Sequence, residues 1–144
     1  MPHYADSSFL VSSYLIDANT KSAHDYLQNV GEPLIFTPLH ALEIANAFEL
    51  ALFRKLVSRE GAAIANQSLA DDLKNARLIQ TTVRWPDIFR LAEKFSKLHT
   101  AATGSRSLDI LHVAAAKKVK AGHFVSFDAR QRALAKAVGL AVVP

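Results

Sequence analysis

Short apolar runs alternate along the chain with longer segments of helical periodicity. The apolar runs predict β-strands at His3 to Ala5, Leu34 to Thr37, Leu78 to Val83, His123 to Phe127 and Leu140 to Val143. Helical patterns begin near Phe9 and cover Thr20 to Val30, Leu39 to Leu56, Arg59 to Asn75, Pro86 to His99, Leu108 to Lys120 and Ala129 to Val138. Strands separated by helices imply right-handed crossovers, so the pattern predicts an α/β fold with three layers and a central parallel sheet of about five strands.

Residues with known preferences at helix ends support these boundaries. Asp6, Ser7, Ser8 and Asp128 are suited to N-caps, and Pro38 to a first helical turn. Gly31 and Gly122 are placed to end helices. The small and polar segment from Ala101 to Ser105, which contains Gly104, predicts a loop.

Composition limits the classes of protein that remain. With 144 residues, 50% of them hydrophobic, the chain is expected to form one domain over residues 1–144 with a sizeable core. It has no apolar run of about 18 to 20 residues and its N-terminus lacks the order of a signal peptide, so we expect a soluble, cytoplasmic protein without a membrane segment. The absence of cysteine excludes disulfides, thiolate metal sites and cysteine nucleophiles.

Charge is distributed unevenly along the sequence. Through Val83 there are six Lys/Arg against nine Asp/Glu, and from Arg84 onward eleven against four, which gives −3 and +7. A basic half suits a polyanion, because each phosphate that Lys or Arg neutralises releases counterions. A solvated basic surface without a partner explains the same numbers.

Two acids follow predicted strands directly. Asp6 comes after the first strand and Asp128 after the strand His123 to Phe127. Ligands of open parallel sheets bind beyond the carboxyl ends of the strands, so both acids are candidate ligands at one sheet edge. Each is also well placed to cap the helix that follows it, and this alternative stays open.

Two further acids lie on helices with little other polar surface. Glu43 interrupts an apolar helix and forms a narrow polar stripe with His40, Asn46 and Glu49. A carboxylate on a mostly buried helix needs a partner, which a cation or solvent would supply. Asp109 lies in a first helical turn, where the helix dipole alone would favour an acid.

The four acids together suggest a single site. Oxygen ligands without cysteine, and without a metalloprotease-type histidine motif, suit a hard cation such as Mg²⁺ or Mn²⁺. One or two such ions can activate water and stabilise an in-line displacement at phosphorus. The pattern therefore favours phosphodiester hydrolysis over acyl chemistry.

These residues resemble the PIN-domain family, and within it the VapC-type toxin ribonucleases of toxin–antitoxin systems. The matching blocks are Tyr4 to Val11, Glu43 with Asn46, Asp109 to Ala116, and Phe124 to Asp128 with Gln131, Leu134, Ala135 and Gly139. The resemblance implies a Mg²⁺- or Mn²⁺-dependent endoribonuclease in which Asp6, Glu43, Asp109 and Asp128 hold one or two ions. Ser126, where the family more often has threonine, would support the last acid or a metal-bound water.

Several side chains near these blocks are candidates for contacts with RNA. Arg106 and His112 lie one turn to either side of Asp109 and either contact the scissile phosphate or pair with a carboxylate, the latter being favoured for His112. The basic residues expected to line an RNA path, or simply to be solvated, are Lys117, Lys118, Lys120, Arg130 and Arg132.

The resemblance also implies partners. Relatives form homodimers and are bound by a cognate antitoxin, whose tail lies along a groove and can insert a basic side chain among the acids. The segment from Arg54 to Val83 matches the family least, so partner choice is expected to be encoded there.

Two other classes of function compete with this interpretation. A receiver-like signalling domain also gathers acids around Mg²⁺, but it needs paired acids after the first strand and a lysine after the last, and this chain has neither. The second alternative is a catalytically inactive PIN-like module that only binds RNA or protein. Acids at all four positions argue against it, and it stays open as the alternative.

Overall fold

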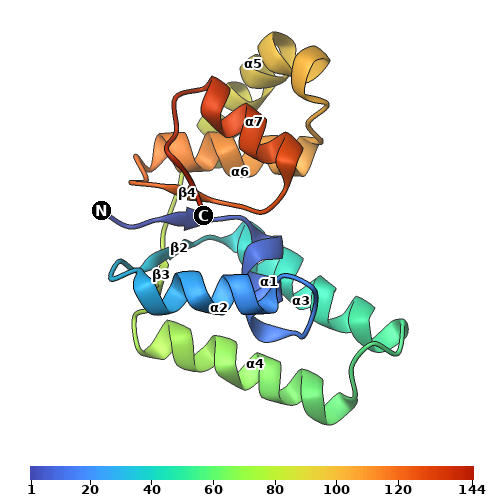
Figure 1. The fold of residues 1–144 in the computed structure, drawn as a ribbon. Coiled ribbons are helices and arrows are strands. Elements are labelled where there is room, and N and C mark those ends of the chain that lie inside the picture. The colour runs from blue at the N-terminus through green and yellow to red at the C-terminus, as the bar shows by residue number, and fades with distance from the viewer. The chain divides into compact units, whose positions relative to one another are not determined.

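The computed structural model describes residues 1–144, which form seven helices and five short strands (Figure 1). In chain order the elements are β1 (Tyr4–Ala5), α1 (Ser7–Tyr14), α2 (Thr20–Asn29), β2 (Leu34–Phe36), α3 (Pro38–Phe53), α4 (Arg59–Lys74), β3 (Leu78–Gln80), α5 (Trp85–Thr103), α6 (Ser107–Lys118), β4 (Phe124–Val125), α7 (Ala129–Ala137) and β5 (Val142–Val143). Every predicted element is present. The α/β class is confirmed.

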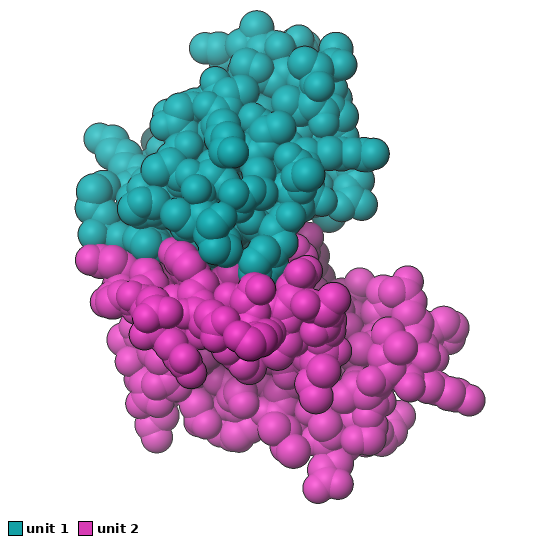
Figure 2. All heavy atoms as spheres, viewed as in Figure 1, with its two compact units in different colours: residues 1–6, 82–144 teal, residues 7–81 magenta.

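All strand pairs are parallel, as predicted, and they form two sheets. One sheet has the order β1-β4-β5 and the other pairs β2 with β3. The chain correspondingly divides into two compact units, residues 1–6 with 82–144 (unit 1) and residues 7–81 (unit 2), coloured separately in Figure 2. Unit 1 holds the sheet β1-β4-β5 and unit 2 the sheet β2-β3. The interpretation of the whole chain as one domain stays a prediction.

The core of unit 1 is built on α6. Its seven consecutive residues from Ile110 to Ala116 are all buried, as expected of a helix that is covered on every side. Helices α5, α6 and α7 pack against one another. Strands β1 and β4 contribute Tyr4 and Phe124, which stack with ring centroids 6.0 Å apart.

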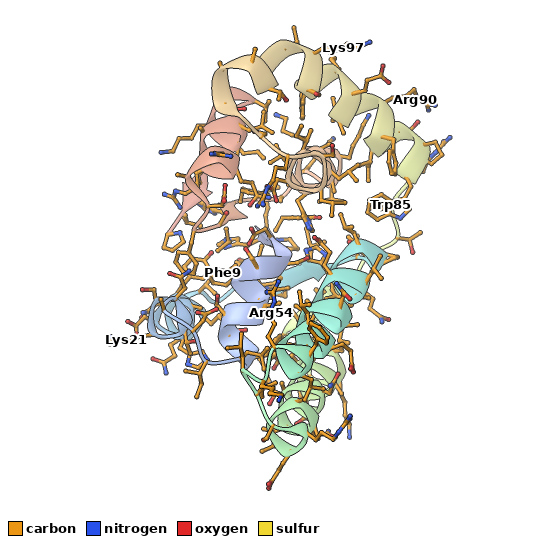
Figure 3. The ribbon with its side chains drawn as sticks, turned by 90° about the vertical axis from the view of Figure 1, so that its right-hand side faces the viewer. Phe9, Lys21, Arg54, Trp85, Arg90 and Lys97 are labelled. Atoms are coloured by element: carbon orange, nitrogen blue, oxygen red, sulfur yellow. The ribbon has the colours of Figure 1, made fainter.

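The core of unit 2 lies among α1, α2, α3 and α4. Helix α1 contacts each of the other three. Phe9 and Phe48 are fully buried there, and the ring of Phe9 meets that of Tyr26 edge-on. Phe9 projects from α1 in Figure 3.

Helix α3 departs from the expected burial. The sequence predicts a helix that is apolar over most of its circumference and packed between other elements, but α3 buries only His40, Ile44, Phe48 and Ala51. Leu42 and Phe53 are 68% and 83% exposed. His40 does not join a polar stripe, because its ring accepts from the backbone N–H of Thr37 at 3.0 Å and closes a capping box at the start of α3.

Several boundaries differ from the sequence interpretation, among them the ends of α3, β4 and β5, and for two others the reason is identifiable. The predicted loop from Ala101 is helical as far as Thr103, since alanine favours helix and Gly104 is the residue that ends it, with φ of 67°. The strand predicted to reach Val83 ends at Gln80, because its partner β2 ends at Phe36, where Thr37 begins to cap α3.

None of the helices combines the length and the apolar character that crossing a bilayer requires.

Candidate functional site

Three of the four predicted acids belong to unit 1, where the parallel pair β1 and β4 fixes the position of two of them. Ala5 is in register with Val125, and the backbone N–H of Asp6 donates to the carbonyl of Val125 at 3.0 Å. Asp6, which is 4% exposed, therefore lies beside Ser126, with Asp128 two residues further along the chain. The prediction that these two acids follow neighbouring strands is confirmed.

Ser126 is the centre of a buried hydrogen-bond network. Its side chain is fully buried, and its hydroxyl donates to Oε1 of Gln131 at 2.7 Å. The same oxygen accepts from the backbone N–H of Asp128 at 3.1 Å and lies 3.4 Å from Oδ2 of Asp6. A hydroxyl has a single hydrogen, so the short contact to Gln131 takes it and the contact to Asp6 is the weaker one.

Asp128 has the structural role that the sequence left open. Its Oδ1 accepts from the backbone N–H of Gln131 at 2.8 Å, which caps α7. The N-cap prediction is thus confirmed. Capping engages one carboxylate oxygen, and the carboxylate remains part of the same network as Ser126 and Gln131.

Asp109 is joined to this network through its backbone. It lies in the first turn of α6, and its carbonyl accepts from Nε2 of Gln131 at 3.4 Å. Its carboxylate pairs with Nε of Arg106 at 3.3 Å, so the pairing alternative for Arg106 is confirmed. Arg106 is 76% exposed, and an ion pair of this kind contributes little stability.

Gln131 is the residue whose role the sequence interpretation missed. It is fully buried, and it links Ser126, Asp128 and Asp109 by three hydrogen bonds. In the sequence it stands out only as one of the matches to the family. The available signal was an amide side chain on the face of α7 that also buries Leu134 and Ala135, since a buried amide requires partners.

His112 contributes to the core. It is 2% exposed, and its Nδ1 lies 2.8 Å from the hydroxyl oxygen of Tyr4 in β1. This contact joins residues 108 positions apart in the chain, and no local pattern predicts it.

Glu43 belongs to unit 2, where it is half-buried on α3. Its Oε1 accepts from the hydroxyl of Ser7, the first residue of α1, at 2.9 Å. The expectation that this carboxylate needs a partner is met by a hydroxyl. Asn46 and Glu49, the other members of the predicted stripe, are exposed.

The basic candidates lie at different places on unit 1. Arg132 donates from Nη1 to the carbonyl of Ser126 at 2.7 Å, so it braces the turn after β4. Arg130 lies against Gly104, where an added Cβ would be 3.7 Å from the Cδ of the arginine. Lys117 has its Nζ near Gly139, past the far end of α7 and therefore about 15 Å of helix away from the Asp128 cap.

The two units differ in net charge, as the two parts of the sequence do. Unit 1 carries eleven Lys/Arg and five Asp/Glu, a net charge of +6, whereas unit 2 carries six and eight, a net charge of −2. On α5, Arg90 and Lys97 point outward with side chains 69% and 74% exposed (Figure 3), and each pairs with an acid of the same helix, Asp87 and Glu93.

The residue types at this site suit a metal ion, but their arrangement in this structure does not form a metal site. No three His, Cys, Asp or Glu side chains meet in a geometry that could hold an ion. The chemistry of the network, carboxylates together with a hydroxyl and an amide oxygen, fits a hard divalent cation and no softer one.

Two solved structures share this fold. VapC20 from Mycobacterium tuberculosis, described as a sarcin-ricin loop cleaving toxin, aligns with a TM-score of 0.66 at 18% identity over 96% of this chain and 95% of its own. FitAcB from Neisseria gonorrhoeae aligns with a TM-score of 0.68 at 14% identity over 99% of this chain and 96% of its own. The fold is that of the PIN-domain toxins. No protein-family profile and no curated protein matches the sequence, so the likeness to PIN-domain toxins lies in the fold.

Proposed function

We propose that this PIN-fold protein is a divalent-metal-dependent endoribonuclease that acts as the toxin of a toxin–antitoxin pair. The observation that carries the proposal is the network in which Asp6, Asp109 and Asp128 are tied together through Ser126 and Gln131, beyond the carboxyl ends of β1 and β4. This is the edge at which parallel sheets bind their ligands.

Asp6, Asp109 and Asp128 would hold Mg²⁺ or Mn²⁺ once their side chains turn toward one another, since three such ligands do not meet in this structure. Glu43 is the fourth acid of the family pattern. When bound, the ion supplies an activated water and stabilises the negative charge that develops at phosphorus. Ser126 and Gln131 hold the strand-end acids in place, and Ser7, which follows Asp6 in the chain, orients the Glu43 carboxylate by the bond at 2.9 Å.

RNA would bind to unit 1, whose net charge of +6 favours a polyanion. Arg130 is the basic side chain best placed to contact a phosphate, because it lies two residues after Asp128 and against the loop that precedes α6. Lys117 would contribute to binding at a distance from the reacting phosphate.

The test is RNA cleavage with Mn²⁺ and with EDTA, using the wild type, Asp6→Asn and Asp109→Asn. Asp87→Asn is a matched control, since Asp87 also lies in a first helical turn of unit 1 and pairs with the arginines Arg84 and Arg90. Both site variants should lose cleavage while Asp87→Asn retains it. Cleavage that persists in EDTA or in the two site variants would refute a metal-dependent nuclease and leave an RNA- or protein-binding module.

The antitoxin is proposed to bind unit 2. A cavity of about 460 Å³ opens among α1, α2 and α4, with Leu10, Leu27, Leu34 and Leu78 among its apolar lining. Part of that lining comes from the segment from Arg54 to Val83, which the sequence associates with partner choice. We also propose a homodimer, as the family resemblance implies.

This assignment is tested in cells. Expression of the wild type without a partner should arrest growth, and co-expression of the antitoxin should relieve the arrest. Leu27→Glu should prevent relief without reducing cleavage, whereas Ile64→Glu, at a position 62% exposed and outside the cavity, should not. Equal toxicity of the wild type and Asp109→Asn would count against a nuclease toxin.

A further inference from the structure

Two histidines face each other at the end of unit 1's sheet opposite to the acids. His3 precedes β1 and His123 precedes β4, so the parallel register that pairs Tyr4 with Phe124 sets the two histidines side by side. Nε2 of His3 lies 3.1 Å from Nδ1 of His123, and the ring centroids are 4.5 Å apart with an interplanar angle of 54°.

The geometry of this pair matches two neighbouring ligands of one metal ion. At a metal–nitrogen distance of about 2.05 Å, two imidazole nitrogens are separated by about 2.9 Å at right angles and by about 3.3 Å in a tetrahedron. The separation of 3.1 Å lies between these values. In this structure the two nitrogens share a hydrogen bond, with one imidazole donating and the other accepting, and a bound ion would take the place of the shared hydrogen.

The backbone holds both rings before any ion binds. The N–H of Tyr4 donates to the carbonyl of His123 at 2.9 Å, and the N–H of Gly122 donates to the carbonyl of Pro2 at 3.0 Å. Gly122 allows the N-terminal segment to lie close, since a Cβ there would be 3.1 Å from Cβ of Met1 and 3.7 Å from Cδ2 of His3. His3 is 8% exposed, so its rotamer is restricted, and ordering two ligands costs little entropy.

We propose that His3 and His123 bind a late first-row divalent ion such as Zn²⁺ or Ni²⁺, at a site separate from the acids. Imidazole nitrogen is a good ligand for these ions and a poor one for Mg²⁺, so the two sites differ in metal preference. Two protein ligands leave the other positions to water or to groups of the exposed Met1. The ion would fasten the N-terminus to His123 and so stabilise β1, the two-residue strand that leads to Asp6.

Binding is measured by titrating Zn²⁺ and Ni²⁺ into the whole protein by calorimetry, with Mg²⁺ present in excess to occupy any oxygen-ligand site. We expect one ion per chain and a Tm raised by about 5–10 °C at a free ion concentration of 100 times Kd. His3→Gln and His123→Gln should each weaken binding at least tenfold. His24→Gln and His99→Gln are controls, because these histidines have other partners: His24 bonds to the carbonyl of Ser13, and the ring of His99 lies against Phe95. Both variants should bind as the wild type does.

A second measurement does not depend on the folding of variants. In the wild type, substoichiometric Ni²⁺ should broaden the ring NMR signals of His3 and His123 before those of the other histidines. Earlier broadening at His24 or His99, or unchanged affinity in both His3→Gln and His123→Gln, would overturn the proposal. Neither measurement involves RNA cleavage, so its outcome is independent of the nuclease assignment.

Discussion

The hydrogen bond between Ser126 and Gln131 permits a quantitative test of the network that positions the acids. Both side chains are fully buried, and the bond between them is 2.7 Å long. Ser126→Ala leaves the Oε1 of Gln131 without its donor and the N–H of Asp128 without its acceptor. A buried polar group that loses its partner costs about 1–3 kcal/mol. Since the Asp128 end is only partly buried, we expect a total loss of about 2–4 kcal/mol.

Replacing the other partner of this bond, Gln131, is predicted to cost less stability. In Gln131→Leu the hydroxyl of Ser126 loses its acceptor but can turn toward Oδ2 of Asp6, 3.4 Å away. The bond to the carbonyl of Asp109 is also lost, but at 3.4 Å it is long and weak. Leucine fills most of the vacated volume, so we expect a loss of about 1–2 kcal/mol.

The double variant distinguishes the effect of the lost hydrogen bond from the effect of replacing buried side chains. Once Ser126 is alanine, replacing Gln131 with leucine removes an unsatisfied buried oxygen, so the second substitution should partly restore stability. Ser126→Ala with Gln131→Leu should therefore unfold at a higher temperature than Ser126→Ala alone, which requires a coupling energy of about 2–3 kcal/mol, larger than the cost of Gln131→Leu by itself.

The assay is thermal and urea unfolding of the four proteins of this cycle. Ser58→Ala, which removes the N-cap of α4, supplies the control. Ser58 shares no hydrogen-bond partner with Ser126, so combining the two substitutions should give additive costs within about 0.5 kcal/mol. If Ser126→Ala and Gln131→Leu are also additive, or if the double variant is the least stable protein, this bond does not organise the acid network.

Three further predictions follow from other contacts. Asp128→Ser keeps an N-cap oxygen, so it should retain the stability of the wild type but lose Mn²⁺ binding measured by calorimetry. Asp128→Ala should lose Mn²⁺ binding and also about 1 kcal/mol of unfolding free energy. Equal stability of the two variants would contradict the capping role. Burial, and then the hydrogen bond to Asp72, raise the pKa of Tyr14 above its ordinary value of 10.0, so the stability that the neutral phenol contributes is complete below pH 10 and declines as the pH rises further. Tm should therefore fall less steeply above pH 10 in Tyr14→Phe than in the wild type. Parallel Tm profiles of the two proteins would refute this role of Tyr14. Arg106→Ala removes an exposed ion pair and should change the unfolding free energy by less than about 1 kcal/mol, so a larger loss in urea unfolding would show that the pair is structural.

The sequence by itself determined the local structure. Asp128 accepts from Gln131, three residues away, and Pro38 lies in the first turn of α3, so the pattern of nearby residues was sufficient to locate these helix starts. The α/β class followed from the alternation of apolar runs with helical periods. The acids at the ends of β1 and β4 could be proposed as neighbours because parallel strands end at a common edge.

Only the tertiary structure decided contacts that join distant parts of the chain. The pairing of β1 with β4 set Ser126 beside Asp6, and His3 beside His123, each across 120 residues. Register was also decisive for strand length, because β3 extends only as far as β2 offers a partner. Such contacts depend on which surfaces pack together. The residues next to Ser126 or His123 in the sequence are compatible with several different tertiary partners. For this reason the partners of Gln131, which link it to Ser126 and Asp109, became recognisable only in the folded chain.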